Sequence, residues 1–97
     1  MIIDGFDWDE GNLAKCQKHG VPVAEIESLF HQDHQIAPDL KHSVAESRQL
    51  AVGRSGLGRP MFVVFTLRER DGKQLVRPIS ARYMHAEEIE RYEQNRS

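Results

Sequence analysis

The sequence has a single cysteine and no long hydrophobic run. Among its 97 residues only Cys16 is a cysteine, which excludes an intrachain disulfide and a cysteine-based zinc site. The longest apolar run, residues 61–65, is far shorter than the roughly 20 residues that a membrane-spanning helix needs. The first ten residues hold four acids and no base, the reverse of a secretory signal peptide. We therefore expect a cytoplasmic protein.

The length limits the architecture. With 39% hydrophobic and 29% charged residues, the composition is that of a globular protein. A chain of 97 residues is too short for two domains, a TIM barrel or a full dinucleotide-binding fold. We expect one domain that covers residues 1–97.

The small net charge of −2 conceals an uneven distribution. Residues 1–47 carry three lysines and nine acids, whereas residues 48–97 carry nine arginines and one lysine against six acids. Arginine presents a planar fork that matches phosphate, so this clustering is compatible with nucleic-acid binding. Taken alone, the charge distribution favours a solvated surface of mixed charge over a nucleic-acid-binding surface.

Hydrophobic periodicity predicts helices in the first half and strands in the second. Residues 1–8 are typical of a short strand, Asp9 and Gly20 of the two ends of a helix, and Pro22 of the start of a second helix that continues to Phe30. Four further strands and a final helix are predicted at residues 34–37, 48–54, 60–67, 74–82 and 86–95. We expect an α+β fold in the order β-α-α-β-β-β-β-α, with an antiparallel sheet and flanking helices.

Single residues refine the prediction for the last strand and for the first helix. Pro78 has no N–H for a sheet ladder, so it predicts an edge or a bulge in the last strand. Leu13 and Cys16 are expected to face the core from the first helix, with Asn12 on the same stripe.

Short motifs follow one another along nearly the whole chain. They are Phe6-Asp7-Trp8-Asp9, Asn12, Lys18-His19-Gly20-Val21, Glu46-Ser47-Arg48, Gly53-Arg54, Val63-Val64-Phe65-Thr66 with Arg68, and Arg77-Pro78-Ile79-Ser80-Ala81-Arg82 with Glu88 and Tyr92 downstream. In this combination and order they resemble the BrnT family, the toxin half of a bacterial type II toxin–antitoxin pair.

The resemblance implies a RelE-like fold and a ribonuclease that needs neither metal nor cofactor and inhibits translation. It also implies a BrnA-like antitoxin partner with a ribbon-helix-helix domain, an RNA substrate, and contact with operator DNA only through the antitoxin.

Metal-free RNA cleavage needs cations for the negative charge that grows on the phosphoryl oxygens. Arg82 and Arg68 are the first candidates, because they lie near the ends of two predicted strands, where their side chains can reach one sheet face. Arg48 and Arg54 are the next candidates, as phosphate-binding residues. For each of the four, the alternative is an exposed arginine that supports solubility or forms a surface ion pair; for Arg82, within the Ile-Ser-Ala-Arg motif, we favour the functional role.

The reaction also needs a base for the 2′-hydroxyl. Lys18 and Glu46 are the candidates, although a lysine at a helix end also stabilises the helix dipole, and Glu46 can instead orient an arginine. His19 and Ser80 are expected to contact phosphate or RNA, and no Ser/His/Asp arrangement that would activate Ser80 is evident.

Two alternatives remain beside this interpretation. One is a metal site in the polar middle of the chain, but its residues lack the spacing of a rigid helical pair: His31, Asp33, His34, Asp39 and His42. The other is a non-catalytic toxin that serves as a co-repressor with its antitoxin. The segment after Arg82 is commonly very basic in the family, whereas residues 83–90 contain three glutamates here, which weakens the grip on RNA.

Overall fold

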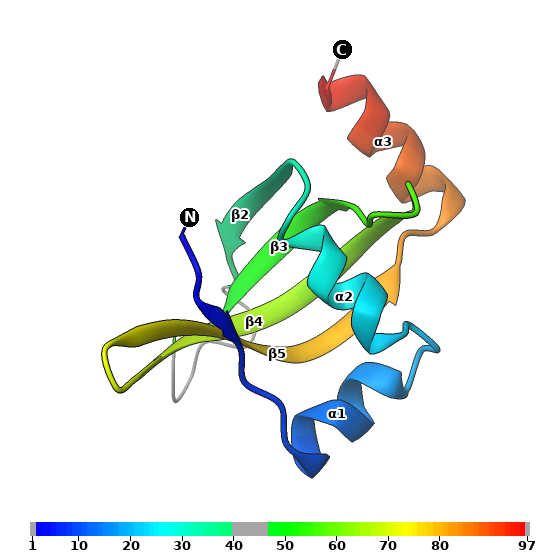
Figure 1. Cartoon of the computed structure of the whole chain (residues 1–97). Coiled ribbons are helices and arrows are strands. Elements are labelled where there is room, and N and C mark those ends of the chain that lie inside the picture. Colours follow the sequence, from blue (N-terminus) through cyan, green and yellow to red (C-terminus); the bar gives the residue numbers. More distant parts are fainter. Residues whose placement is uncertain (1, 40–46, 97) are drawn as a thin grey trace.

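The computed structural model describes residues 2–39 and 47–96 and shows a five-stranded sheet with three helices (Figure 1). The strands are β1 (Gly5–Phe6), β2 (His34–Pro38), β3 (Gln49–Arg54), β4 (Pro60–Arg70) and β5 (Lys73–Tyr83). The helices are α1 (Glu10–Gln17), α2 (Val23–Leu29) and α3 (Ala86–Arg96). The strand order is β1-β5-β4-β3-β2. This confirms the α+β class and the predicted order of elements.

The sheet is mixed rather than purely antiparallel. β2, β3, β4 and β5 pair antiparallel, whereas β1 pairs parallel with β5 through Gly5 opposite Leu75 and Phe6 opposite Val76. The first strand is also shorter than the predicted residues 1–8, because only Gly5–Phe6 pairs with β5 as a strand.

Helix α1 begins at the predicted cap, Asp9, but it ends at Gln17, earlier than the end predicted from Gly20. The Asp9 carboxylate accepts a hydrogen bond of 3.1 Å from the Asn12 backbone N–H, and the Asn12 side chain accepts one of 2.7 Å from the Asp9 backbone N–H. This reciprocal pair is a capping box. After the helix, Gly20 has a φ of +74°, a left-handed conformation that glycine adopts without strain.

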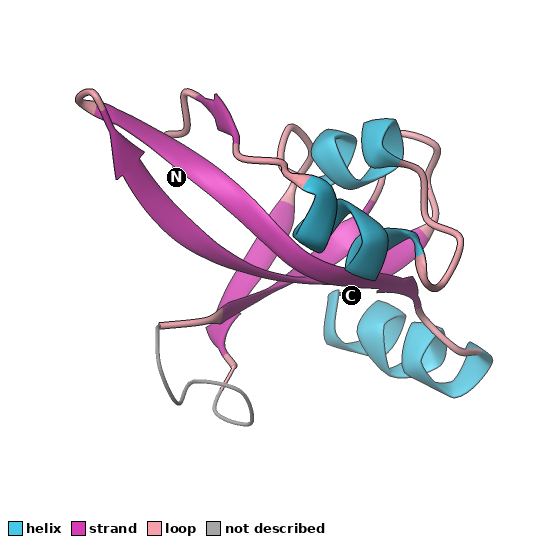
Figure 2. Cartoon of the chain, turned by 90° about the horizontal axis from the view of Figure 1, so that it is seen from below, coloured by secondary structure: helices cyan, strands magenta, loops and turns pink. Residues whose placement is uncertain are grey.

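The hydrophobic core lies between the sheet and the two N-terminal helices. Figure 2 shows α1 and α2 on one side of the sheet and α3 on the other. The largest fully buried side chains of this core include Phe65, Ile26, Leu29, Met61, Val21, Val63 and Val76. The prediction for Leu13 was wrong, since it is 38% exposed while Asn12 and Cys16 are buried. The Asn12 amide instead donates hydrogen bonds to the backbone carbonyls of Asp7 and Pro78, at 2.9 and 2.8 Å, which turns Leu13 outward.

A bulge in β5 determines which side chains share the outer face of the sheet. Val64 lies opposite Ser80 and Phe65 opposite Pro78, so Ile79 has no partner in the β4–β5 ladder. This confirms the bulge predicted from Pro78. In a regular strand Arg77 and Ser80 would point to opposite faces, but the extra residue brings Arg77 to the face that also carries Ser80 and Arg82.

None of the helices within residues 2–39 and 47–96 is long and apolar enough to cross a membrane.

Candidate active site

The outer face of the sheet carries a hollow of about 390 Å³, which we name the Arg82 hollow. Leu50, Phe62 and Val64 form its apolar floor on β3 and β4. Among the described residues, His19, Asp39, Ser80, Ala81 and Arg82 also line it. His19 follows α1, whereas Ser80 and Arg82 belong to β5, so elements distant in sequence contribute to one hollow.

Arg82 is held by three groups. Its Nη1 and Nη2 donate to the two carboxylate oxygens of Glu88 on α3, at 2.8 and 2.9 Å. Nη1 also donates to the Tyr83 carbonyl at 3.2 Å, and the guanidinium lies 4.8 Å from the centre of the Phe62 ring. The hydrogen bonds from Arg82 lower the pKa of Glu88 to about 2, with further lowering by the His85 backbone N–H. The side chain of Arg82 therefore has a defined position although it is 37% exposed.

A second hollow of about 270 Å³, the Arg68 hollow, lies beside α1. It is lined by Gly11, Asn12, Lys15, Arg48, Arg68, Arg77 and Ile79, which include four cationic side chains. Arg77 forms ion pairs with Asp9 at 2.9 Å and Asp7 at 3.6 Å. The backbone N–H of Asn12, and next Arg77, lower the pKa of Asp9, so this carboxylate stays ionised beside the hollow.

Arg68 and Arg82 share the outer face of the sheet but line different hollows. Arg82 lies opposite Phe62, and Arg68 lies six residues further along β4. At about 3.3 Å per residue this is a separation of roughly 20 Å along the strand. His19 and Ser80 join Arg82, whereas Arg48 joins Arg68.

Three other predicted site residues lie elsewhere. Lys18 is exposed at the C-terminal cap of α1 and lines neither hollow. Arg54 pairs with Glu93 of α3 at 2.7 Å and lies 5.9 Å from the centre of the Tyr92 ring, outside both hollows. Glu46 lies outside the described residues.

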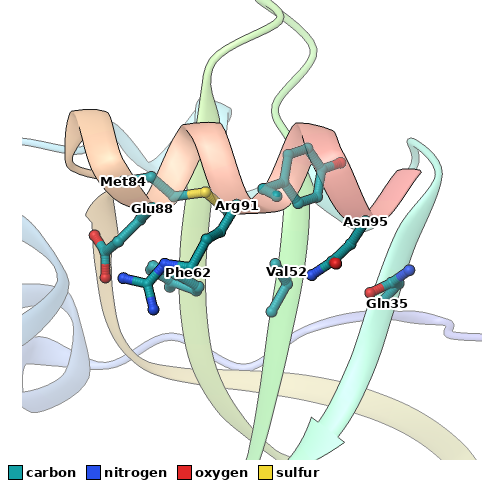
Figure 3. Close-up of a pocket in the computed structure, with 8 residues that line it drawn as sticks. Gln35, Val52, Phe62, Met84, Glu88, Arg91 and Asn95 are labelled. Carbon is teal, nitrogen blue, oxygen red and sulfur yellow. The ribbon is translucent and has the colours of Figure 1, made fainter. Parts of the chain in front are cut away.

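Helix α3 and the sheet enclose a third hollow of about 250 Å³, shown in Figure 3. Val52 and Phe62 lie on the strands below the helix, and Glu88 and Arg91 project from α3. Tyr92, on the same helix, is only 8% exposed.

The histidines in the middle of the chain pack on aromatic rings. The His31 ring lies 6.1 Å from that of Phe6, and the His34 ring 5.5 Å from that of Phe30, both edge-on. Within residues 2–39 and 47–96, no three His, Cys, Asp or Glu residues are grouped as metal ligands. His42 lies outside these ranges.

The sequence alone assigned no site role to Arg77, Lys15 or Glu88, and it assigned Asp39 only to the alternative metal site. Pro78 carried a signal for Arg77, because a bulge at that point shifts the alternation of β5 and changes the face on which Arg77 lies. The pairing of Glu88 with Arg82 has no comparable signal, because it depends on how α3 turns back after β5.

Comparison with known proteins agrees with the resemblance seen in the sequence. The model of the BrnT family, the ribonuclease toxin of type II toxin–antitoxin systems, matches residues 8–88. The chain belongs to the BrnT family. The Arg82 hollow, the Arg68 hollow and the Arg82–Glu88 pair all lie within the matched range. As a BrnT protein the chain is a ribonuclease toxin with a protein antitoxin as partner. No curated protein sequence matches the chain.

Proposed function

We propose that this BrnT protein cleaves RNA without a metal ion, and that the Arg82 hollow is where the scissile phosphate binds. The observation that carries the proposal is the arrangement of His19, Ser80 and Arg82 around one hollow on the outer sheet face. A cation, a hydroxyl and an imidazole together supply charge stabilisation, a hydrogen bond and a proton-transfer group.

The reaction would use the nucleophile already present in RNA. The 2′-hydroxyl attacks the adjacent phosphorus and the bond to the 5′-oxygen breaks, which leaves a 2′,3′-cyclic phosphate and a 5′-hydroxyl. Arg82 stabilises the charge that develops on the phosphoryl oxygens, because two of its N–H groups can bind two oxygens at once. Ser80 donates a hydrogen bond to the same phosphate.

Two protons move in this step. His19 protonates the leaving 5′-oxygen, a role that imidazole often takes in acid–base catalysis. The proton of the 2′-hydroxyl passes to Lys18 or Glu46, which remain the two candidates for the base. The variants Lys18→Met and Glu46→Gln separate them, because only loss of the true base removes the rise of kcat with pH on the acid side of the profile.

The Arg68 hollow would hold a part of the RNA backbone that lies further along the strand from the reacting phosphate. Lys15, Arg48, Arg68 and Arg77 line it, and β5 runs from this hollow to the Arg82 hollow. Cations along such a path bind successive phosphates without reading sequence.

Two wider consequences belong to the same proposal. Cleavage of messenger RNA inhibits translation, and a BrnA-like ribbon-helix-helix antitoxin binds the toxin and links it to operator DNA. Induced expression is expected to stop amino-acid incorporation, and co-expression of the antitoxin is expected to restore it.

The chemistry is tested with purified protein and RNA in excess EDTA. The expected result is cleavage to 2′,3′-cyclic phosphate ends, and no cleavage of the same RNA carrying 2′-O-methyl groups. Cleavage only after addition of a divalent metal would contradict the metal-free reaction. Absence of cleavage at any dose, on naked RNA and in a translating extract, together with retained antitoxin binding, would favour the co-repressor role.

A further inference from the structure

The guanidinium of Arg82 has five N–H groups, and the structure accounts for three of them. One on Nη1 and one on Nη2 donate to Glu88, and the second on Nη1 donates to the Tyr83 carbonyl. The N–H of Nε and the second N–H of Nη2 have no hydrogen-bond partner within residues 2–39 and 47–96. These two groups form the side edge of the guanidinium, which can bind two phosphate oxygens at once.

Arg82 and Glu88 line different hollows. Arg82 lines the Arg82 hollow with His19 and Ser80, whereas Glu88 lines the hollow beneath α3. The Glu88 carboxylate therefore holds the guanidinium from the α3 side, and the side edge remains available to the hollow where phosphate is expected.

The position of Glu88 is itself fixed by the start of α3. Its Oε1 accepts a hydrogen bond of 2.8 Å from the backbone N–H of His85, the residue before the helix. This is half of a capping box, an interaction that glutamine can also make at this position. The backbone beside Arg82 is tied down from the other face of the sheet, where the Tyr83 hydroxyl donates to the buried Glu25 at 2.6 Å.

We propose that Glu88 is a positioning residue, which binds the end of the Arg82 guanidinium so that the Nε–Nη2 edge is presented to the scissile phosphate. The proposal rests on the proposed function, because it assigns the orienting partner of the arginine in that site. The proposal also gives a role in the reaction to the glutamate-rich segment after Arg82. The negative charge of that segment alone predicts only weaker binding of RNA.

The kinetic test compares Glu88→Gln with Glu90→Gln, the same substitution at an exposed position of the same helix. Glutamine keeps the helix cap but loses the paired ionic contact with Arg82. We expect Glu88→Gln to keep the wild-type Tm within a few degrees and to lower kcat by about 10- to 100-fold with little change in KM, because a misplaced group weakens only the transition state. Glu90→Gln is expected to match the wild type.

Faster cleavage or tighter RNA binding by Glu88→Gln would overturn the proposal, because Glu88 would then block the arginine. Equal kcat values for Glu88→Gln and Glu90→Gln would overturn it as well. Should Glu88→Gln fail to fold, Glu88→Asp replaces it, since a shorter carboxylate keeps the charge and displaces the guanidinium.

A spectroscopic test separates this proposal from the proposed function. The Arg82 Nε–H resonance is assigned by its loss in Arg82→Lys and followed while a 2′-O-methyl RNA tetranucleotide is added. We expect the resonance to shift in the wild type and the shift to be lost in Glu88→Gln. An unmoved Nε–H in the wild type would overturn the positioning role, whereas absence of RNA cleavage with a shifted Nε–H would overturn only the proposed reaction.

Discussion

The carboxylate of Glu88 and the guanidinium of Arg82 meet through two parallel hydrogen bonds of 2.8 and 2.9 Å. This pair joins the first turn of α3 to the end of β5, on the outer face of the sheet. It couples the basic strand to the acidic helix, so the two charge-rich segments of the second half form one structural unit.

The first prediction concerns the acid stability of the Arg82–Glu88 pair. The pKa of Glu88 is lowered from its ordinary value of 4.5 to about 2, so the pair stabilises the fold above about pH 4.5 and this contribution disappears as the pH falls through about 2. The Tm difference between wild type and Glu88→Gln is expected to be constant from pH 7 to pH 5 and to shrink towards pH 2. A difference that is unchanged at pH 2 would show that the pair does not carry it. Glu90→Gln serves as the control.

The second prediction concerns Asn12, which joins α1 to the bulged part of β5. Asn12→Ala leaves the carbonyls of Asp7 and Pro78 without their donor in a buried place. We expect a loss of about 3 kcal/mol in the free energy of unfolding, measured in urea. Leu13→Ala is the matched control at the next position, and because Leu13 is exposed we expect a loss below about 1 kcal/mol. Equal losses in the two variants would contradict the arrangement.

The sequence was sufficient for much of this fold because many of its signals are local. Asp9 marks the start of α1 through its side-chain cap, Gly20 marks the left-handed turn that follows the helix, and Pro78 marks the bulge because it has no N–H. Leu13 was misplaced because periodicity treats every apolar residue as inward. It does not foresee that the buried Asn12 amide satisfies two carbonyls and sets the rotation of the helix.

The candidate site could be predicted only in part. The motifs supplied Arg82, Ser80 and His19, which the structure brings to one hollow, and Arg48 and Arg68, which it brings to another. They supplied no distances, so the roughly 20 Å of strand between Arg68 and Arg82 and the position of Lys18 outside the two hollows required the structure. The Arg82–Glu88 pair depends on tertiary packing, which sequence spacing does not encode.

The third prediction concerns Cys16. The thiol is fully buried, and this burial raises its pKa to about 11. Because the thiolate is the reactive form, we expect the folded protein to react with a disulfide reagent at pH 8 only as fast as it opens, and the unfolded protein to react at once. Reaction of the folded protein at the rate of a free thiol would contradict the buried position of Cys16.

The fourth prediction concerns the Arg68 hollow as a path for the RNA backbone. Arg68→Ala is expected to weaken binding of uncleavable 2′-O-methyl RNA similarly for all sequences. It is also expected to reduce the slope of log K against log salt by about 0.7, the value for one phosphate contact in a single strand. Arg70→Ala, at the exposed end of β4, is expected to leave the slope unchanged. The same slope in wild type and Arg68→Ala would remove Arg68 from the RNA contact.

Arg82 is the group proposed to stabilise the reacting phosphate. The direct measurement is kcat/KM for RNA cleavage in EDTA by wild type, Arg82→Ala and Arg70→Ala, two variants that each lose one arginine. We expect Arg82→Ala to lose about 100-fold or more, as when a preorganised transition-state donor is removed, and Arg70→Ala to retain wild-type activity. Activity of Arg82→Ala equal to that of Arg70→Ala would contradict the account.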